Sequence, residues 1–131
     1  MTDNEKFKNM IENAYLQQKQ MIELNYTQFK NMIENAYLQQ KQMIETNASI
    51  MKNYSNIFGN NEIVSNIEKV ESNFLTLNEE SKKSMINQLD LIKDNFLSNA
   101  IRIKEEYNKM PNIDKFMPNY DGSGGIKEKS R

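Results

Sequence analysis

An internal repeat dominates the first half of this chain. The segment Phe7 to Glu23 recurs letter for letter as Phe29 to Glu45, so the two copies start 22 residues apart. When the chain is cut into elevens from Phe7, each of the first four has Met at its fourth place, Ile at its fifth and Glu at its sixth. A fixed period of this kind indicates a repetitive architecture. Eleven residues in three turns correspond to ~3.67 residues per turn, which predicts a long amphipathic helix.

The repeat places its apolar residues on one side of that helix. The first, fourth, fifth, eighth and ninth places of each eleven fall within an arc of ~130°, about the width of a core-facing stripe. We expect the helix to run from about Asp3, as its N-cap, to about Ile57, within a repeat segment over residues 1–58. Its length of ~80 Å is too great for the inside of a monomeric globule. The predicted apolar interaction stripe comprises Phe7, Met10, Ile11, Tyr15, Met21, Ile22, Tyr26, Phe29, Met32, Ile33, Tyr37, Met43 and Ile44.

A second helix is predicted after a short break at residues 59–61. Gly59, Asn60 and Asn61 form the break, because Gly and Asn tolerate the left-handed conformation that ends helices. Apolar residues then recur at spacings of three and four, which predicts a helix over residues 62–110. The stripe of this helix comprises Ile63, Ile67, Val70, Phe74, Leu77, Met85, Leu89, Ile92, Phe96, Ile103 and Tyr107. A flexible tail that contains Gly and Ser is expected over residues 111–131.

These elements predict an all-α fold of two long amphipathic helices, arranged as a helical hairpin or as an extended coiled coil. Each stripe must be covered, because a helix gains most of its stability by burying an amphipathic face. Three covers are considered: the other helix of the same chain, further copies of the chain, or an apolar surface that is not protein. The sequence predicts self-association into homo-oligomers, since Gln18 and Gln40 at the centre of the stripe can pair in a bundle.

The composition argues against several other functions. A net charge of −1 offers no electrostatic footprint for nucleic acid. No apolar run approaches the ~20 residues of a membrane span, so no transmembrane segment is expected. The N-terminal sequence lacks the layout of a signal peptide, which favours a cytoplasmic location.

Catalytic chemistry is not predicted. The chain has no Cys and no His, which removes thiolate and imidazole ligands as well as the usual general base. The acidic pairs Glu79-Glu80 and Glu105-Glu106 are neighbours in sequence, and such neighbours do not face each other on a helix. We therefore expect no catalytic residues, no metal site and no cofactor, and the chain is predicted not to be an enzyme.

The long helices rich in Gln, Asn, Met and Tyr, with segments such as Glu12 to Glu23, resemble those of phasins. Phasins are small helical proteins that coat polyhydroxyalkanoate granules in bacteria and archaea. The resemblance covers Phe7 to about Tyr107 and implies an amphipathic coat at the surface of a storage granule, coiled-coil oligomers and no catalytic site. The function predicted is therefore adsorption to a hydrophobic polymer or lipid surface. The alternative is a coiled-coil scaffold or oligomerisation module with only protein partners.

Overall fold

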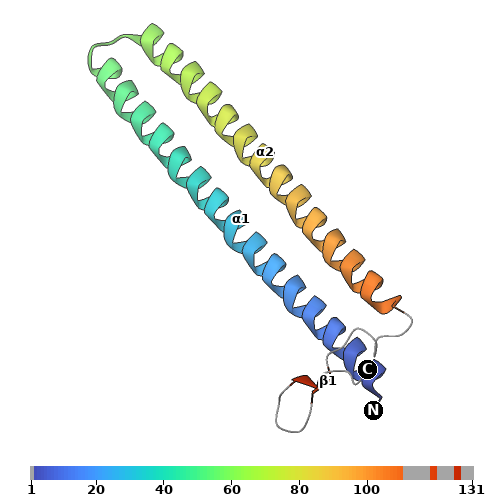
Figure 1. Cartoon of the computed structure of the whole chain (residues 1–131). Coiled ribbons are helices and arrows are strands. Elements are labelled where there is room, and N and C mark those ends of the chain that lie inside the picture. The colour runs from blue at the N-terminus through green and yellow to red at the C-terminus, as the bar shows by residue number, and fades with distance from the viewer. Residues whose placement is uncertain (1, 111–118, 121–125, 128–131) are drawn as a thin grey trace. The chain divides into compact units, whose positions relative to one another are not determined.

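Two long α-helices make up most of the structure. The computed structural model describes residues 2–110, 119–120 and 126–127. Helix α1 spans Asp3–Ile57 and helix α2 spans Asn61–Asn108 (Figure 1). The predicted all-α fold is confirmed, and on either side of the turn the two helices form the predicted hairpin (Figure 1).

Two very short strands follow the helices. Strand β1 (Asn119–Tyr120) pairs antiparallel with β2 (Ile126–Lys127). A pairing of this length does not alter the all-α class. The rest of the tail predicted over 111–131 lies outside the described residues.

Helix α1 begins with a capping box. The backbone N–H of Glu5 donates to Oγ1 of Thr2 at 3.2 Å, and the backbone N–H of Thr2 donates to Oε2 of Glu5, also at 3.2 Å. The N-cap is therefore Thr2, whereas Asp3, which the sequence suggested for this role, is the first helical residue. Asp3 and Glu5 both lie in the first turn, where the helix dipole favours negative charge.

Three residues reverse the chain between the helices. The backbone N–H of Asn60 donates to the carbonyl of Ser55, and that of Gly59 donates to the carbonyl of Asn56, each at 3.0 Å. This is a Schellman motif, and it requires the positive φ of 68° that Gly59 adopts. Asn60 then starts α2, because its Oδ1 accepts the backbone N–H of Ile63 at 3.1 Å. One Asn thus serves both helix ends, which makes the turn short.

By its contacts the chain divides into two compact units. The turn unit comprises Ile22–Asn95, and the terminal unit comprises Met1–Met21 with Phe96–Arg131. In the turn unit the second part of α1 and the first part of α2 run antiparallel, side by side, on either side of the turn (Figure 1). In the terminal unit the start of α1 meets the end of α2, since the rings of Phe7 and Tyr107 pack edge to face with centroids 6.4 Å apart.

The helices of the turn unit meet along a mixed apolar and polar seam. Its members recur at steps of three and four residues and are at least half-buried. The seam residues are Ile22, Tyr26, Lys30, Ile33, Tyr37, Lys41, Ile44, Ala48 and Lys52 of α1 with Val64, Ile67, Glu71, Leu75, Asn78, Lys82, Ile86, Leu89 and Lys93 of α2. Among them only Ala48 and Asn78 are fully buried. The two helices alone therefore enclose little apolar core.

Candidate interaction face

Tyrosines of α1 and lysines of α2 pair across the hairpin. In the turn unit, Nζ of Lys82 lies 4.1 Å from the ring centroid of Tyr37, and Nζ of Lys93 lies 4.3 Å from that of Tyr26. In the terminal unit, Lys104 lies over Tyr15 at 4.2 Å. Each of these distances is within the ~6 Å at which a cation is attracted to an aromatic face.

These pairs share one antiparallel register, because Tyr15, Tyr26 and Tyr37 advance by eleven residues while Lys104, Lys93 and Lys82 step back by eleven. The apolar pattern of the sequence does not single out these lysines. Their spacing of eleven in the second helix was the signal that could have identified them.

The end of the turn unit that lies farthest from the turn is held by a tyrosine hydroxyl. Oη of Tyr26 donates a hydrogen bond of 2.5 Å to Oδ1 of Asp90. This hydrogen bond raises the pKa of Tyr26 above its usual value, and partial burial and the carboxylates of Asp90, Asp94 and Glu34 act in the same direction. Tyr26 therefore stays neutral while Lys93 lies against its ring.

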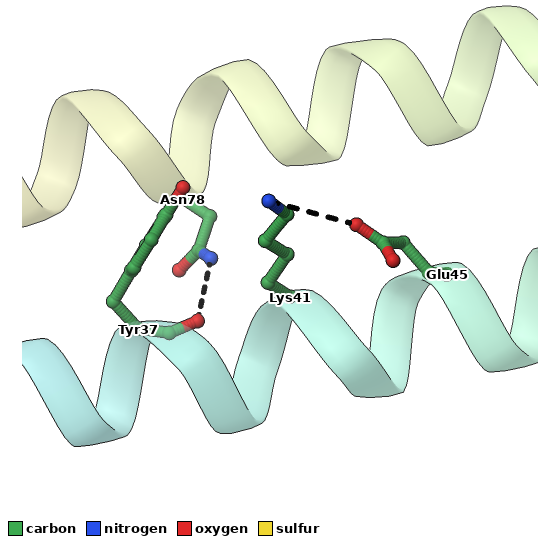
Figure 2. Close-up of polar contacts among 4 residues, drawn as sticks. All are labelled: Tyr37, Lys41, Glu45 and Asn78. Carbon is green, nitrogen blue, oxygen red and sulfur yellow. Dashed lines mark hydrogen bonds and ion pairs between the residues drawn. The ribbon is translucent and has the colours of Figure 1, made fainter.

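Closer to the turn, a buried amide joins the two helices. Nδ2 of Asn78 donates to the main-chain carbonyl of Tyr37 at 3.1 Å, and Figure 2 shows the Tyr37 side chain extending towards α2 beside it. Lys41 lies one turn further along and pairs with Glu45 of its own helix at 4.0 Å. An amide at this depth must be hydrogen-bonded, so its position relative to Tyr37 is specified.

Ion pairs also cross between the helices. Nζ of Lys52 lies 3.3 Å from Oε1 of Glu71 in the turn unit, and both side chains are largely buried, at 27% and 18% exposure. In the terminal unit, Lys104 lies 3.5 Å from Glu12. The seam thus brings together polar groups that are satisfied inside the hairpin.

The stripe predicted for α1 is divided between the seam and solvent. Its isoleucines and tyrosines face α2, namely Ile11, Ile22, Ile33, Ile44, Tyr15, Tyr26 and Tyr37, and Phe7 is half-buried as well. Its methionines remain exposed, at 60–64% for Met10, Met21, Met32 and Met43, as does Phe29 at 55%. Helix α2 therefore packs against the edge of the stripe that carries lysine, and leaves the other edge uncovered.

The stripe predicted for α2 lies mostly in solvent. Ile67 and Leu89 belong to the seam. The exposed members are Ile63, Val70, Phe74, Leu77, Met85, Ile92, Phe96, Ile103 and Tyr107. In most places the seam residue of α2 is the one that directly follows a predicted stripe residue: Leu75 follows Phe74, and Lys93 follows Ile92.

The exposed apolar residues of both helices share one side of the hairpin in the turn unit. On α1 Met32 and Met43 directly precede the seam residues Ile33 and Ile44, and Met51 precedes Lys52. On α2 Val70 and Phe74 directly precede Glu71 and Leu75. One residue corresponds to a rotation of about 100°. Because the helices are antiparallel, the residues that directly precede seam residues point to the same side of the hairpin on both helices.

The grooves beside the seam confirm this arrangement. One groove of about 400 Å³ is lined by Ile44, Asn47, Ala48, Met51, Ile63, Asn66, Ile67, Val70, Glu71 and Phe74, so it combines seam residues with residues that precede them. A second groove of about 330 Å³ is lined by Tyr37, Lys41, Glu68, Glu71, Ser72, Leu75, Thr76 and Glu79, so it combines seam residues with residues that directly follow seam residues. The turn unit therefore has an apolar side and a polar side.

The tripeptide Met-Ile-Glu encodes this division in α1. In Met32-Ile33-Glu34 the Met lies on the apolar side, the Ile in the seam and the Glu on the polar side, and the pattern recurs at 21–23 and 43–45. We define the apolar face as Phe29, Met32, Met43 and Met51 of α1 with Ile63, Val70, Phe74, Leu77, Met85 and Ile92 of α2.

Several other kinds of site are not found in the part of the chain that the structure describes. Within residues 2–110 and the two strands, no group of three or more Asp or Glu side chains is placed to hold a metal ion. Neither described helix has a segment apolar enough to span a bilayer. Comparison with protein-family models, with curated proteins and with solved structures finds no match to this chain.

Proposed function

We propose that this protein has no enzymatic activity and acts by adsorbing, through its apolar face, to an extended hydrophobic surface. The observation that carries the proposal is the exposure of large apolar side chains from both helices on one side of the turn unit. A face of this kind is an interaction site, because soluble proteins rarely leave contiguous apolar patches uncovered. Four of the ten residues of the face are methionines, whose flexible side chains suit an irregular surface.

The kind of surface follows from the residues that border and interrupt the face. On the outer flank of α1 lie the uncharged residues Gln28 and Gln39, while Gln40 and Asn47 lie within the face. Amides are costly against pure hydrocarbon but can donate to ester carbonyls. A polyester surface therefore fits better than an alkane, which agrees with the resemblance to phasins. We propose a cytoplasmic storage granule of polyhydroxyalkanoate as the surface.

A second candidate function is a scaffold with only protein partners. The same amides favour it, since a polar residue in an apolar interface can pair with a partner amide and set the register of a bundle. On α2, Asn66 and Gln88 lie between exposed apolar residues just as Gln40 does on α1.

Sedimentation with polymer particles tests the adsorption. Purified protein is mixed with polyhydroxyalkanoate nanoparticles, the particles are spun down and the bound fraction is measured. Met32→Lys places a charge on the apolar face and should strongly reduce the bound fraction. The matched control, Asn31→Lys, adds the same charge at the preceding exposed residue, away from the face, and should bind like the parent protein.

Equal binding of the parent protein and Met32→Lys would contradict the proposal. So would a parent protein that remains in the supernatant with particles in excess. Oil droplets in place of polyester distinguish the two chemistries, because the amides should lower the affinity for the oil.

A further inference from the structure

We infer that in solution the apolar face of the turn unit is covered by a second copy of the same face, so that two hairpins form a four-helix dimer. This dimer and the surface-bound form are mutually exclusive, because both bury the same side chains. The inference uses the structure of the face and does not depend on which surface the protein adsorbs to.

The area of the face is that of a stable dimer interface. Its members, from Phe29 to Ile92, are each 45–64% exposed. At roughly 100 Å² for a large apolar side chain that is half exposed, the face offers on the order of 1,000 Å² per copy. A standard specific interface buries about 800 Å² per partner. A single hairpin cannot cover this area, because its own second helix already occupies the adjacent side.

Most of the charged side chains on α1 and α2 in the turn unit lie away from the face. Glu34 and Glu45 of α1 follow seam residues, as do Glu68, Glu79 and Asp90 of α2, so all of these carboxylates lie on the polar side or at its edge. The flank of the face on α1 carries the uncharged Gln28 and Gln39, and by the same helical geometry the flank on α2 carries Asn73, Ser84 and Asn95 together with the charged Glu62, Lys69 and Glu80. The face itself contains no charged residue, and its flanks carry charges of both signs, so two identical faces can meet without a build-up of like charge, which would otherwise oppose a symmetric contact.

The amide side chains within the face favour contact with a second copy of the protein over contact with a hydrocarbon surface. Gln40 and Asn47 of α1 and Asn66 and Gln88 of α2 would lose hydrogen bonds against hydrocarbon. Against another copy of this face they meet the same donors and acceptors. In a two-fold contact every residue that one copy offers is also offered by the other, so the amides have partners.

The groove beside the turn can accept a side chain from the second copy. At Ala48 the spacing of eleven that places Tyr26 and Tyr37 in the seam brings an Ala instead, with an exposure of only 6%. The groove of about 400 Å³ opens beside it, between Met51, Val70 and Phe74. A large side chain from the second copy can enter this groove, as a knob enters a hole between packed helices.

The oligomeric state tests the inference directly. Sedimentation velocity of the full chain, without particles, should show a dimer that dissociates on dilution. Phe74→Lys should shift the population to monomer, whereas its control Thr76→Lys, which places the charge on the polar side, should leave the dimer intact. A parent protein that is monomeric at all concentrations would overturn the inference.

Spin labels locate the interface without relying on a destabilising charge. The chain has no Cys, so single Cys residues can be introduced cleanly. Labels at Met85→Cys on the face should give a shorter distance between the two copies than labels at Lys83→Cys, which lies at nearly the same height on the polar side; the difference should be about two helix widths, ~20 Å, since each copy contributes one. The reverse order of distances would show a dimer formed through the other side and would overturn the inference.

Addition of polyester particles separates this inference from the proposed function. If both hold, particles convert the dimer into bound protein, and the short distance between labels at Met85→Cys disappears. A dimer that never binds particles contradicts the adsorption alone. A monomer that binds particles contradicts the dimer alone.

Discussion

Nζ of Lys82 lies 4.1 Å from the ring centroid of Tyr37, and this contact joins α1 to α2 across the turn unit. The same kind of contact between Lys93 and Tyr26 follows at 4.3 Å. The turn unit thus adds contacts between aromatic rings and ammonium groups to its isoleucine and leucine contacts, while Met32, Met43 and Phe74 stay exposed.

The coupling between Lys82 and Tyr37 should be measurable. In a double-mutant cycle with Tyr37→Leu and Lys82→Met, we expect an interaction free energy of about 0.5–1 kcal/mol, since the pair is partly exposed. Urea unfolding followed by circular dichroism gives the four free energies of unfolding. A coupling of zero, with both single variants destabilised, would show that the two side chains contribute by packing alone.

Two of the ion pairs of the turn unit should differ in strength. Removing Glu71 by Glu71→Gln should cost about 1 kcal/mol, because Lys52 is then left largely buried without its partner. The exposed pair of Lys83 and Glu79, at 3.5 Å with 67% and 51% exposure, serves as the control, and Glu79→Gln should change the free energy of unfolding by ~0.5 kcal/mol or less. Added salt should weaken the exposed pair more. Equal losses for the two variants would contradict this assignment.

The stability of the hairpin should fall at alkaline pH through Tyr26. Its pKa in the folded protein is raised by the hydrogen bond to Asp90, so the folded state holds the phenolic proton more tightly than the unfolded chain does. The resulting stabilisation is fully present below the ordinary tyrosine pKa of about 10 and is lost as the pH rises through the higher folded value.

Titration of tyrosinate absorbance can detect this group. The parent protein should contain one tyrosine that ionises later than in Asp90→Ala, and Tyr26→Phe should remove that late component. Tyr54→Phe is a control, because Tyr54 is 65% exposed and lies outside the seam. Identical titrations of the parent protein and Asp90→Ala would refute the role of Asp90.

The turn should be sensitive to a single methyl group. Gly59→Ala forces an L-residue to adopt a φ of 68°, at a cost of about 1 kcal/mol, although nothing within 4 Å obstructs the added Cβ. Asn53→Ala, in the exposed interior of α1, should instead stabilise slightly because Ala is the better helix former. Thermal unfolding distinguishes the two, and a neutral Gly59→Ala would mean that the positive φ is not required.

The fold could be read from the sequence because the repeat of α1 and the Gly59-Asn60 stop are local signals. What the apolar spacing could not decide was which edge of the stripe α2 would cover. Apolar area alone favours burying Met32, yet the seam takes Ile33 and Tyr37, because each Tyr can also interact with a Lys of α2.

The contacts between the two helices could not be predicted from the sequence of either helix alone. Asp90 meets Tyr26, and Asn78 meets the carbonyl of Tyr37, only after the turn has set which residues lie opposite each other. Neither pair has a sequence signature, since each joins residues far apart in the chain. The partner of the apolar face is likewise not specified by spacing.

The turn has one more consequence, which concerns alignment. Because the eleven-residue repeats of α1 are nearly identical, a shift of the register between α1 and α2 by eleven residues would place Tyr26 opposite Lys82 and Lys41 opposite Glu71. The contacts in the shifted register would resemble the native ones. Two helices with such repeats have several alternative registers of similar energy. The three-residue turn at Gly59 is too short to allow an eleven-residue shift, so it fixes a single register.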